Sequence, residues 1–192
     1  MEEYWTKELR KEIIKRGRES AKFKKFISTK EGAKYYDPNK PDISGAISEK
    51  DCLILDTLVK QFKPKVIFEI GTWFGTSAAV MQAAAPDAKI YTCDKHDVCT
   101  INVSGISVLH LTSKQAIKKL QKKGVKIDLV FADGRLMDGD EKRLVKMGMK
   151  VFLTHDYEGK EKGYWNIKKM KKVFRGKLLT TETTIAGIYG ES

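Results

Sequence analysis

The sequence predicts a doubly wound α/β fold in which a mostly parallel sheet ends in an antiparallel hairpin. From residue 48 onward, short apolar runs rich in Val, Ile and Phe alternate with helical patterns. Strands separated by helices favour parallel pairing, because a helical crossover returns the chain to the same end of the sheet. The last two extended runs, 178–181 and 184–189, lie too close together for a crossover, so we expect them to form the hairpin.

Length and composition exclude several classes of protein. The chain has 192 residues, enough for one domain of ordinary size, and its 41% hydrophobic content argues against disorder. No apolar run approaches the roughly 20 residues that span a bilayer, and the charged N-terminus lacks the apolar core of a secretory signal. Three cysteines cannot all pair, and none lies in a C-x-x-C motif. We therefore expect a cytoplasmic protein without a membrane partner.

The formal net charge is +12, and residues 113–192 carry 19 basic against 10 acidic residues. Lysine pairs such as Lys118–Lys119 and Lys168–Lys169 occur at spacings that place them on solvent-exposed helix faces. A nucleic-acid-binding surface needs such charges gathered on one face, which a sequence does not show. Solvated helices are therefore favoured, and nucleic acid is the less favoured partner.

Residues 1–45 form a basic N-terminal helical segment and loop, distinct from the α/β domain expected at 46–192. Trp5, Leu9 and Ile13 recur every four residues and predict an amphipathic helix, with a second short helical pattern and a proline-rich loop after it. A stripe this regular needs a partner. We expect the segment to act as a lid over a cleft or as the interface of a homodimer.

The elements of the α/β domain follow from local signals. Ser48 is expected to cap a helix, because acidic residues follow in its first turn and apolar residues recur at helical spacing before Pro64. Strands are expected at 66–70, 89–93, 106–111, 127–132 and 151–154, and helices at 76–85, 141–147 and 164–174. A further helix, capped by Ser113, is expected to end at Gly124.

Polar residues gather where the predicted strands end, the edge at which open parallel sheets bind ligands. The first strand runs through Glu69 into a turn with Gly71 and Gly75, where glycine permits a tight turn and close approach of a ligand. The second strand ends at Asp94, 23 residues after Gly71, where a carboxylate can accept both hydroxyls of a ribose. The fourth strand ends at Asp133.

The glycine pattern separates two nucleotide chemistries. A dinucleotide fold uses G-x-G-x-x-G, whose middle glycine leaves room for a pyrophosphate. Here Trp73 and Phe74 stand in that region and would obstruct a diphosphate. The turn E-x-G-x-x-x-G suits a ligand with an amino-acid head and a positive centre, which is the chemistry of S-adenosylmethionine.

With these motifs the sequence resembles the class I S-adenosylmethionine-dependent methyltransferases. The segments VIFEIGTWFGTSAAVM, KIYTCDKHD, IDLVFADG and VFLTHDYEG have the order and spacing of the family's strands one, two, four and five, over roughly residues 44–189. The sequence is similar to the small O-methyltransferase-like group that includes cephalosporin hydroxylase and macrolide-sugar methyltransferases. The resemblance implies a Rossmann-like methyltransferase sheet and transfer of a methyl group to an oxygen, less readily a nitrogen, of a small-molecule acceptor.

The resemblance also assigns roles to residues. It implies that Glu69 organises the first loop or faces the amino group of the cofactor, and that Asp94 holds the ribose. The run at 111–113 falls where relatives often have Gly-Asp-Ser beside the adenine. The cofactor-binding residues implied are Glu69, Gly71, Thr72, Gly75, Ser77, Asp94, Thr112, Ser113 and Asp133.

Asp133, His155 and Asp156 are the candidate catalytic residues. Asp133 and Asp156 end neighbouring strands, and two carboxylates so close repel unless a cation or proton lies between them. We therefore expect either a raised pKa in one of them or a divalent cation, Mg²⁺ or Mn²⁺, bound by Asp133 and Asp156. A carboxylate, His155 or the metal would then help to deprotonate a hydroxyl of the acceptor.

Two other functions stay open. A nucleic-acid (RNA) methyltransferase fits the charge, although no N-P-P-Y-like motif follows the fourth strand. A catalytically inactive binding protein that keeps the cofactor fold fits two departures from the family: the run at 111–113 lacks the Asp of Gly-Asp-Ser, and Arg135 and Leu136 stand after Gly134 where the family has a His. A zinc site at Cys93, His96 and Cys99 lacks a fourth ligand and is disfavoured. His110 is expected to be a hydrogen-bonded residue of the core.

Overall fold

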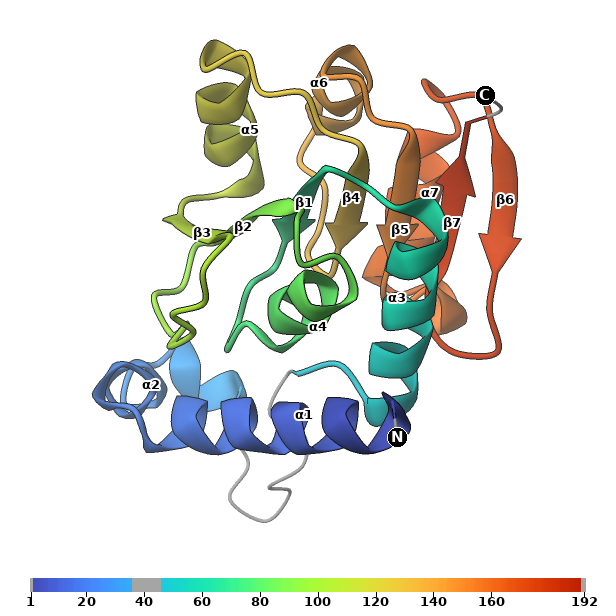
Figure 1. The fold of residues 1–192 in the computed structure, drawn as a ribbon. Coiled ribbons are helices and arrows are strands. Elements are labelled where there is room, and N and C mark those ends of the chain that lie inside the picture. Colours follow the sequence, from blue (N-terminus) through green and yellow to red (C-terminus); the bar gives the residue numbers. More distant parts are fainter. Residues whose placement is uncertain (1, 36–45, 191–192) are drawn as a thin grey trace.

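The computed structural model describes residues 2–35 and 46–190 (Figure 1). Seven strands form one sheet in the order β3-β2-β1-β4-β5-β7-β6. The strands are β1 (Val66–Ile70), β2 (Lys89–Asp94), β3 (Ile106–His110), β4 (Leu129–Ala132), β5 (Val151–Thr154), β6 (Lys177–Thr180) and β7 (Ala186–Tyr189). The helices are α1 (Glu2–Glu19), α2 (Ala21–Ile27), α3 (Glu49–Phe62), α4 (Thr76–Ala84), α5 (Ser113–Lys122), α6 (Asp140–Lys146) and α7 (Lys162–Met170), with 3₁₀ turns η1 (Gly32–Tyr35) and η2 (Glu158–Lys160).

The pairing of the strands confirms the predicted fold class. The neighbours among β1 to β5 pair in parallel, whereas β7 runs antiparallel to both β5 and β6. The chain winds from β1 outward to β3 and then returns to the other side of β1 with β4. This reversal creates a crevice at the carboxyl ends of β1 and β4, the position at which such sheets bind ligands.

Apolar side chains cover both faces of the sheet. On one face, Ile117 of α5, Leu144 of α6 and Ile167 of α7 belong to one buried cluster with strand residues. On the other face, α3 and α4 pack through residues such as Leu55 and Met81. Figure 1 shows α3 and α4 in front of the sheet and α7 behind it. The sheet is therefore packed on both faces, and the polar side chains at its strand ends project from a buried core.

The N-terminal segment is helical as predicted and packs on its own chain. Helix α1 lies below the carboxyl ends of the strands in Figure 1 and contacts α3 and α4. Ile13 of α1 and Phe23 of α2 are buried in one cluster with Phe74 and Val98. The side chain of Trp5, the first residue of the predicted stripe, lies outside the described residues. The described part of the stripe therefore has an intramolecular partner.

Some local predictions need correction. His110 is not a core residue: it ends the edge strand β3, its side chain is 44% exposed, and Nε2 lies 3.3 Å from Asp97 Oδ1. Thr112, not Ser113, caps α5, because the Thr112 hydroxyl accepts from the Gln115 amide in a capping box. Ser48 caps α3 as predicted. Among the described residues, no helix is long and apolar enough to span a membrane.

Candidate active site

The loop between β1 and α4 is shaped by two glycines. Gly71 has φ +99°, and a Cβ there would lie 3.0 Å from backbone atoms of Asp133 and Gly134. Gly75 has φ +93°, and its Cβ would lie 2.5 Å from the side chain of Ile101. Any other residue would be strained at both positions. Gly71 therefore lets the loop lie against the end of β4, and Gly75 lets it pass the side chain of Ile101.

Glu69 lies beneath this loop and is fully buried. Its carboxyl group accepts hydrogen bonds from the hydroxyls of Ser77 and Thr92, and Thr92 in turn lies 2.6 Å from the Thr72 hydroxyl. Burial raises the pKa of Glu69 to about 8, although the two hydroxyl donors act in the opposite direction. Of the two roles predicted for Glu69, the geometry supports the organisation of the loop.

Asp94 fixes the loop from the end of β2. Its Oδ2 accepts from the amide of Trp73 at 3.0 Å, and its Oδ1 accepts from the amide of His96 at 2.9 Å. Each carboxylate oxygen has a second lone pair, so both oxygens can still accept a hydroxyl. Asp94 thus holds the loop in place and still has the lone pairs needed to accept the hydroxyls of a ribose.

A cavity of about 590 Å³ opens at this edge of the sheet. It brings together five predicted cofactor residues, which are Gly71, Asp94, Thr112, Ser113 and Asp133. Thr72 and Ser77 line a narrow neighbouring crevice that shares Gly71 and Asp133 with the cavity. Glu69 and Gly75 line neither space: Glu69 is buried beneath the loop, and Gly75 is the last loop residue before α4. Lysine and arginine side chains that the prediction did not include, Lys95, Arg135 and Lys162, complete the cavity wall.

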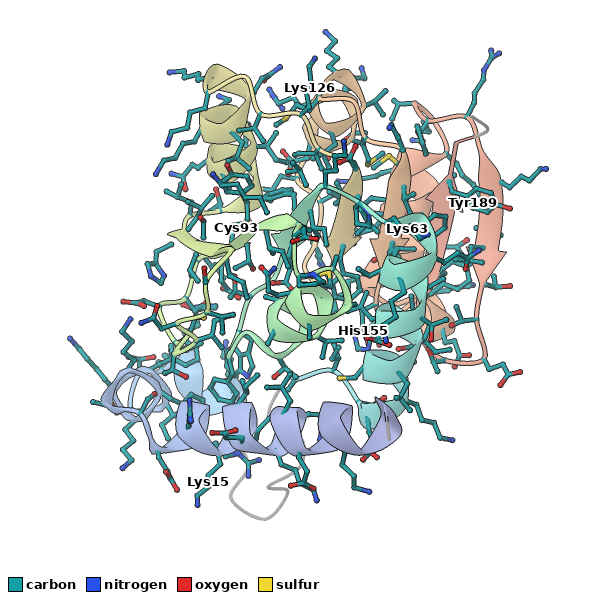
Figure 2. All side chains as sticks on the ribbon, in the orientation of Figure 1. Lys15, Lys63, Cys93, Lys126, His155 and Tyr189 are labelled. Atoms are coloured by element: carbon teal, nitrogen blue, oxygen red, sulfur yellow. The ribbon has the colours of Figure 1, made fainter. Side chains whose placement is uncertain are left out.

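The three candidate catalytic residues meet beside the cavity. His155 Nδ1 lies 3.0 Å from Asp133 Oδ1 and 3.0 Å from Asp156 Oδ1. His155 Nε2 lies 3.2 Å from Oδ2 of Asp51, which reaches over from α3, and Figure 2 shows His155 beside that helix. Lys162 Nζ lies 2.8 Å from Asp133 Oδ1 and 3.0 Å from Asp156 Oδ2. The acid cluster consists of these five residues.

The protein supplies the cations between its own carboxylates. Burial alone would lower the pKa of His155, but hydrogen bonds to Asp133, Asp156 and Asp51 outweigh it and raise the pKa to about 11. The hydrogen bond from His155 lowers the pKa of Asp156 to about 2. The predicted rise of a carboxyl pKa is therefore wrong for Asp156. The raised pKa favours the protonated form of His155 at neutral pH, which argues against His155 as the general base.

The donor set, as the side chains are placed, does not fit a divalent cation. Asp133 and Asp156 are the pair predicted to bind it, and together with His155 they are the group among the described residues with metal-ligand spacing. Lys162 Nζ already lies within 3.0 Å of both carboxylates, and both ring nitrogens of His155 already face carboxylate oxygens, Nδ1 those of Asp133 and Asp156 and Nε2 that of Asp51. Cys93, His96 and Cys99 form no such group in the described part of the chain, and all three cysteines are free and buried.

Sequence reasoning missed Asp51 and Lys162. Asp51 is one of the acidic residues expected in the first turn after Ser48, yet it accepts hydrogen bonds from the Ser48 and Thr184 hydroxyls and from His155. Burial would raise its pKa, but the His155 and Ser48 hydrogen bonds hold it well below the usual range. For Lys162, the only feature of the sequence that could have indicated a tight turn toward the site is the glycine that follows it, Gly163. A Cβ at Gly163 would overlap the carbonyl oxygen of His155, so the chain turns back tightly there.

The likeness of this chain to known proteins lies in its structure. No family model and no curated protein matches the sequence. The structure is similar to the SAH-bound methyltransferase PaMTH1 of Podospora anserina, with 16% identity, a TM-score of 0.61, and coverage of 90% of this chain and 89% of that one. It is also similar to the O-methyltransferase TomG of Streptomyces achromogenes in complex with SAM, with 15% identity, a TM-score of 0.59, and coverage of 90% and 91%.

Two further structures extend the comparison. An O-methyltransferase of Bacillus cereus in complex with SAH has 14% identity and a TM-score of 0.59, with 89% and 91% of the two chains covered. MycE, a methyltransferase of mycinamycin biosynthesis in complex with Mg, SAH and mycinamycin VI, has 14% identity and a TM-score of 0.55, with 72% of this chain and 49% of MycE covered. The chain therefore has the fold of these methyltransferases, as its sequence motifs implied.

Proposed function

We propose that this chain is an S-adenosylmethionine-dependent methyltransferase that methylates an oxygen, less readily a nitrogen, of a small-molecule acceptor. The observation that carries the proposal is the cavity at the carboxyl ends of β1, β2 and β4, with Gly71, Asp94 and Asp133 in its wall. Its volume of about 590 Å³ lies within the range of roughly 300–1,000 Å³ typical of small-ligand sites. The fold shared with SAM- and SAH-bound methyltransferases supports the same assignment.

Each part of the cofactor has a counterpart in the cavity wall. Asp94 would accept the ribose hydroxyls, and Thr112 and Ser113 at the start of α5 would lie beside the adenine. The backbone at Gly71 would run along the methionine part, which Thr72 and Ser77 would approach from the narrow crevice. Glu69 and Gly75 would act indirectly, by holding the loop in shape.

Bound S-adenosylmethionine would supply an electrophilic methyl group, whose carbon–sulfur bond breaks with its electron pair left on sulfur as the acceptor's oxygen bonds to the carbon. Alignment of the two reactants provides much of the acceleration of such a displacement. Asp133 is the carboxylate of the acid cluster that lines the cavity, so we assign to it the acceptor's proton. His155 would position Asp133, and Asp156 would hold His155 and Lys162.

The described part of the N-terminal segment fits a lid more readily than a dimer interface. Phe23 and Phe26 pack edge-on against Trp73, which lines the cavity, with ring centroids 5.9 and 5.8 Å apart. Lys22 Nζ and Asp97 Oδ1, 2.7 Å apart, join α2 to the loop after β2. We propose that the segment covers the cofactor side of the cleft, and that the protein needs no second copy for this.

We also propose a cytoplasmic location and a small-molecule partner in preference to nucleic acid. A cytoplasmic location fits three cysteines that are all free and buried. Nucleic acid stays the less favoured partner, because the lysines of α5, such as Lys118 and Lys119, are exposed on a helix face as in ordinary solvated helices. Filter binding of RNA at several salt concentrations tests this point.

Calorimetry with S-adenosylhomocysteine tests the proposed function. The wild-type protein should bind it, and Asp94→Ala should weaken binding about ten- to a hundred-fold, since a hydrogen bond to a charged group contributes roughly 1.5–3 kcal/mol. Asp87→Ala is the matched control, because Asp87 is an exposed aspartate in the turn before β2, outside the cavity. Equal affinity in the wild type and Asp94→Ala, or no binding by the wild type, would refute the assignment.

A further inference from the structure

The acid cluster is a centre in which a side-chain ammonium stands where a bridging cation is expected. Lys162 Nζ contacts one oxygen of Asp133 and one of Asp156, at 2.8 and 3.0 Å. A cation shared by two carboxylates occupies this kind of position, because it lowers the repulsion between them. The ammonium is therefore the counter-ion of the pair.

The backbone around Lys162 is built to place it there. Asp156 has φ +55° and Lys160 has φ +58°, and the Gly163 amide donates to the Asp156 carbonyl oxygen at 3.1 Å. These left-handed residues fold the connection between β5 and α7 back on itself. Because Gly163 has no Cβ, α7 can begin directly against the His155 carbonyl.

The charges of the cluster support the same interpretation. Lys162 forms an ion pair with Asp133 and another with Asp156. Three carboxylates, those of Asp51, Asp133 and Asp156, then face the two cations His155 and Lys162. One negative charge remains, and a divalent cation added to this set would leave it positively charged next to the proposed sulfonium.

Lys162 also faces the cavity, where it lines the wall with Asp133. An ammonium has three N–H donors, and its contacts with Asp133 and Asp156 use two of them. The third donor is available to an oxygen of a bound acceptor. A divalent cation in other proteins binds such an oxygen and balances its negative charge.

We propose that Lys162 takes the place of a divalent cation at this centre, so that the protein balances Asp133 and Asp156 without a metal. The inference rests on the proposed function, since it assigns to Lys162 the acceptor side of the methyl-transfer site. It sets this chain apart from the Mg-containing complex of MycE.

Binding of Mn²⁺ alone, followed by electron paramagnetic resonance, tests the proposal on the full chain. The wild-type protein should show no specific Mn²⁺ binding. Lys162→Met removes the ammonium and keeps the length of the side chain. The variant should therefore bind Mn²⁺ specifically, with an affinity at least about tenfold above the non-specific level of the wild type. Lys162→Arg keeps the charge and should behave like the wild type. Lys168→Met, an exposed lysine of the same helix, is the matched control and should bind no Mn²⁺.

Specific Mn²⁺ binding by the wild type that is lost in Asp133→Asn would overturn the proposal, and this measurement does not depend on the folding of any Lys162 variant. Unchanged Mn²⁺ binding in a folded Lys162→Met protein, judged by circular dichroism, would also overturn it. S-adenosylhomocysteine affinity is measured on the same samples. If the wild-type protein does not bind S-adenosylhomocysteine, the proposed function is rejected. The Mn²⁺ measurements still decide whether Lys162 takes the place of a divalent cation in the acid cluster.

Discussion

Replacing Glu69 with Gln should remove a pH-dependent loss of stability. Burial raises the pKa of Glu69 from 4.5 to about 8 in the folded protein. Between these values the folded protein keeps a proton that the unfolded chain has lost, so the free energy of unfolding falls as pH rises. At 1.36 kcal/mol per pKa unit, the difference between 4.5 and about 8 lowers the free energy of unfolding by at most about 5 kcal/mol at pH 8 and above.

Urea unfolding of the wild type and Glu69→Gln at about pH 5, 7 and 9 measures this effect. Gln has the shape of a protonated Glu, and the Ser77 and Thr92 hydroxyls can turn to suit its amide. The two proteins should therefore differ by less than about 1 kcal/mol at pH 5. At pH 9 the variant should be more stable by about 2–5 kcal/mol. Subtracting the two curves cancels the contribution of every other titrating group, His155 included.

Glu158→Gln provides the matched control, because Glu158 is an exposed glutamate in η2. Its difference from the wild type should stay flat across the pH range. A flat difference for Glu69→Gln, or a loss of stability at every pH, would mean that Glu69 is ionised and held by its two hydroxyl donors. S-adenosylhomocysteine affinity should change less than about threefold in Glu69→Gln, since a larger effect needs a direct charged contact with the cofactor.

Two further substitutions test the lid and the turn at α7. Gly163→Ala should lower the stability by more than about 2 kcal/mol, because its Cβ would overlap the His155 carbonyl oxygen. Gly124→Ala is the control, because its added Cβ would meet no atom within 4 Å. It should lower the stability by only about 1–2 kcal/mol, the cost of a left-handed backbone in a residue other than glycine. Equal thermal unfolding of the two variants would contradict this account. Phe23→Ala should cost about 3–5 kcal/mol and also weaken S-adenosylhomocysteine binding measured by calorimetry. Phe62→Ala, at the other end of the sheet, should lose stability without that effect, and a Phe23 variant with unchanged affinity would argue against a lid.

The fold could be predicted because its signals are local. The Ser48 cap, the apolar runs of the strands and the short link between the last two strands each depend on neighbouring residues. The error at His110 has a physical cause, since an apolar run shows that a residue belongs to a strand and does not show where that strand lies. β3 is an edge of the sheet, and His110 ends it.

The candidate site could be predicted in part, because topology brings the carboxyl ends of parallel strands together. This rule placed Asp94, Asp133 and His155 at one edge without knowledge of their contacts. It could not place Asp51, which approaches from α3 and is 104 positions from its partner His155. It also could not place Lys162, whose position depends on the left-handed turn at Asp156.

Lys162, which the sequence did not predict at the site, changes the interpretation of Asp133 and Asp156. With Asp133 and Asp156 considered alone, repulsion required a metal or a proton between them. Lys162 and His155 remove that requirement and leave the cluster with one excess negative charge beside the cavity. The wall of the neighbouring cavity also carries Lys95 and Arg135, so the charge of the cluster alone does not exclude a diphosphate. What disfavours a dinucleotide is therefore steric, because the bulky side chain of Trp73 in the first loop lines the cavity where a pyrophosphate would need room.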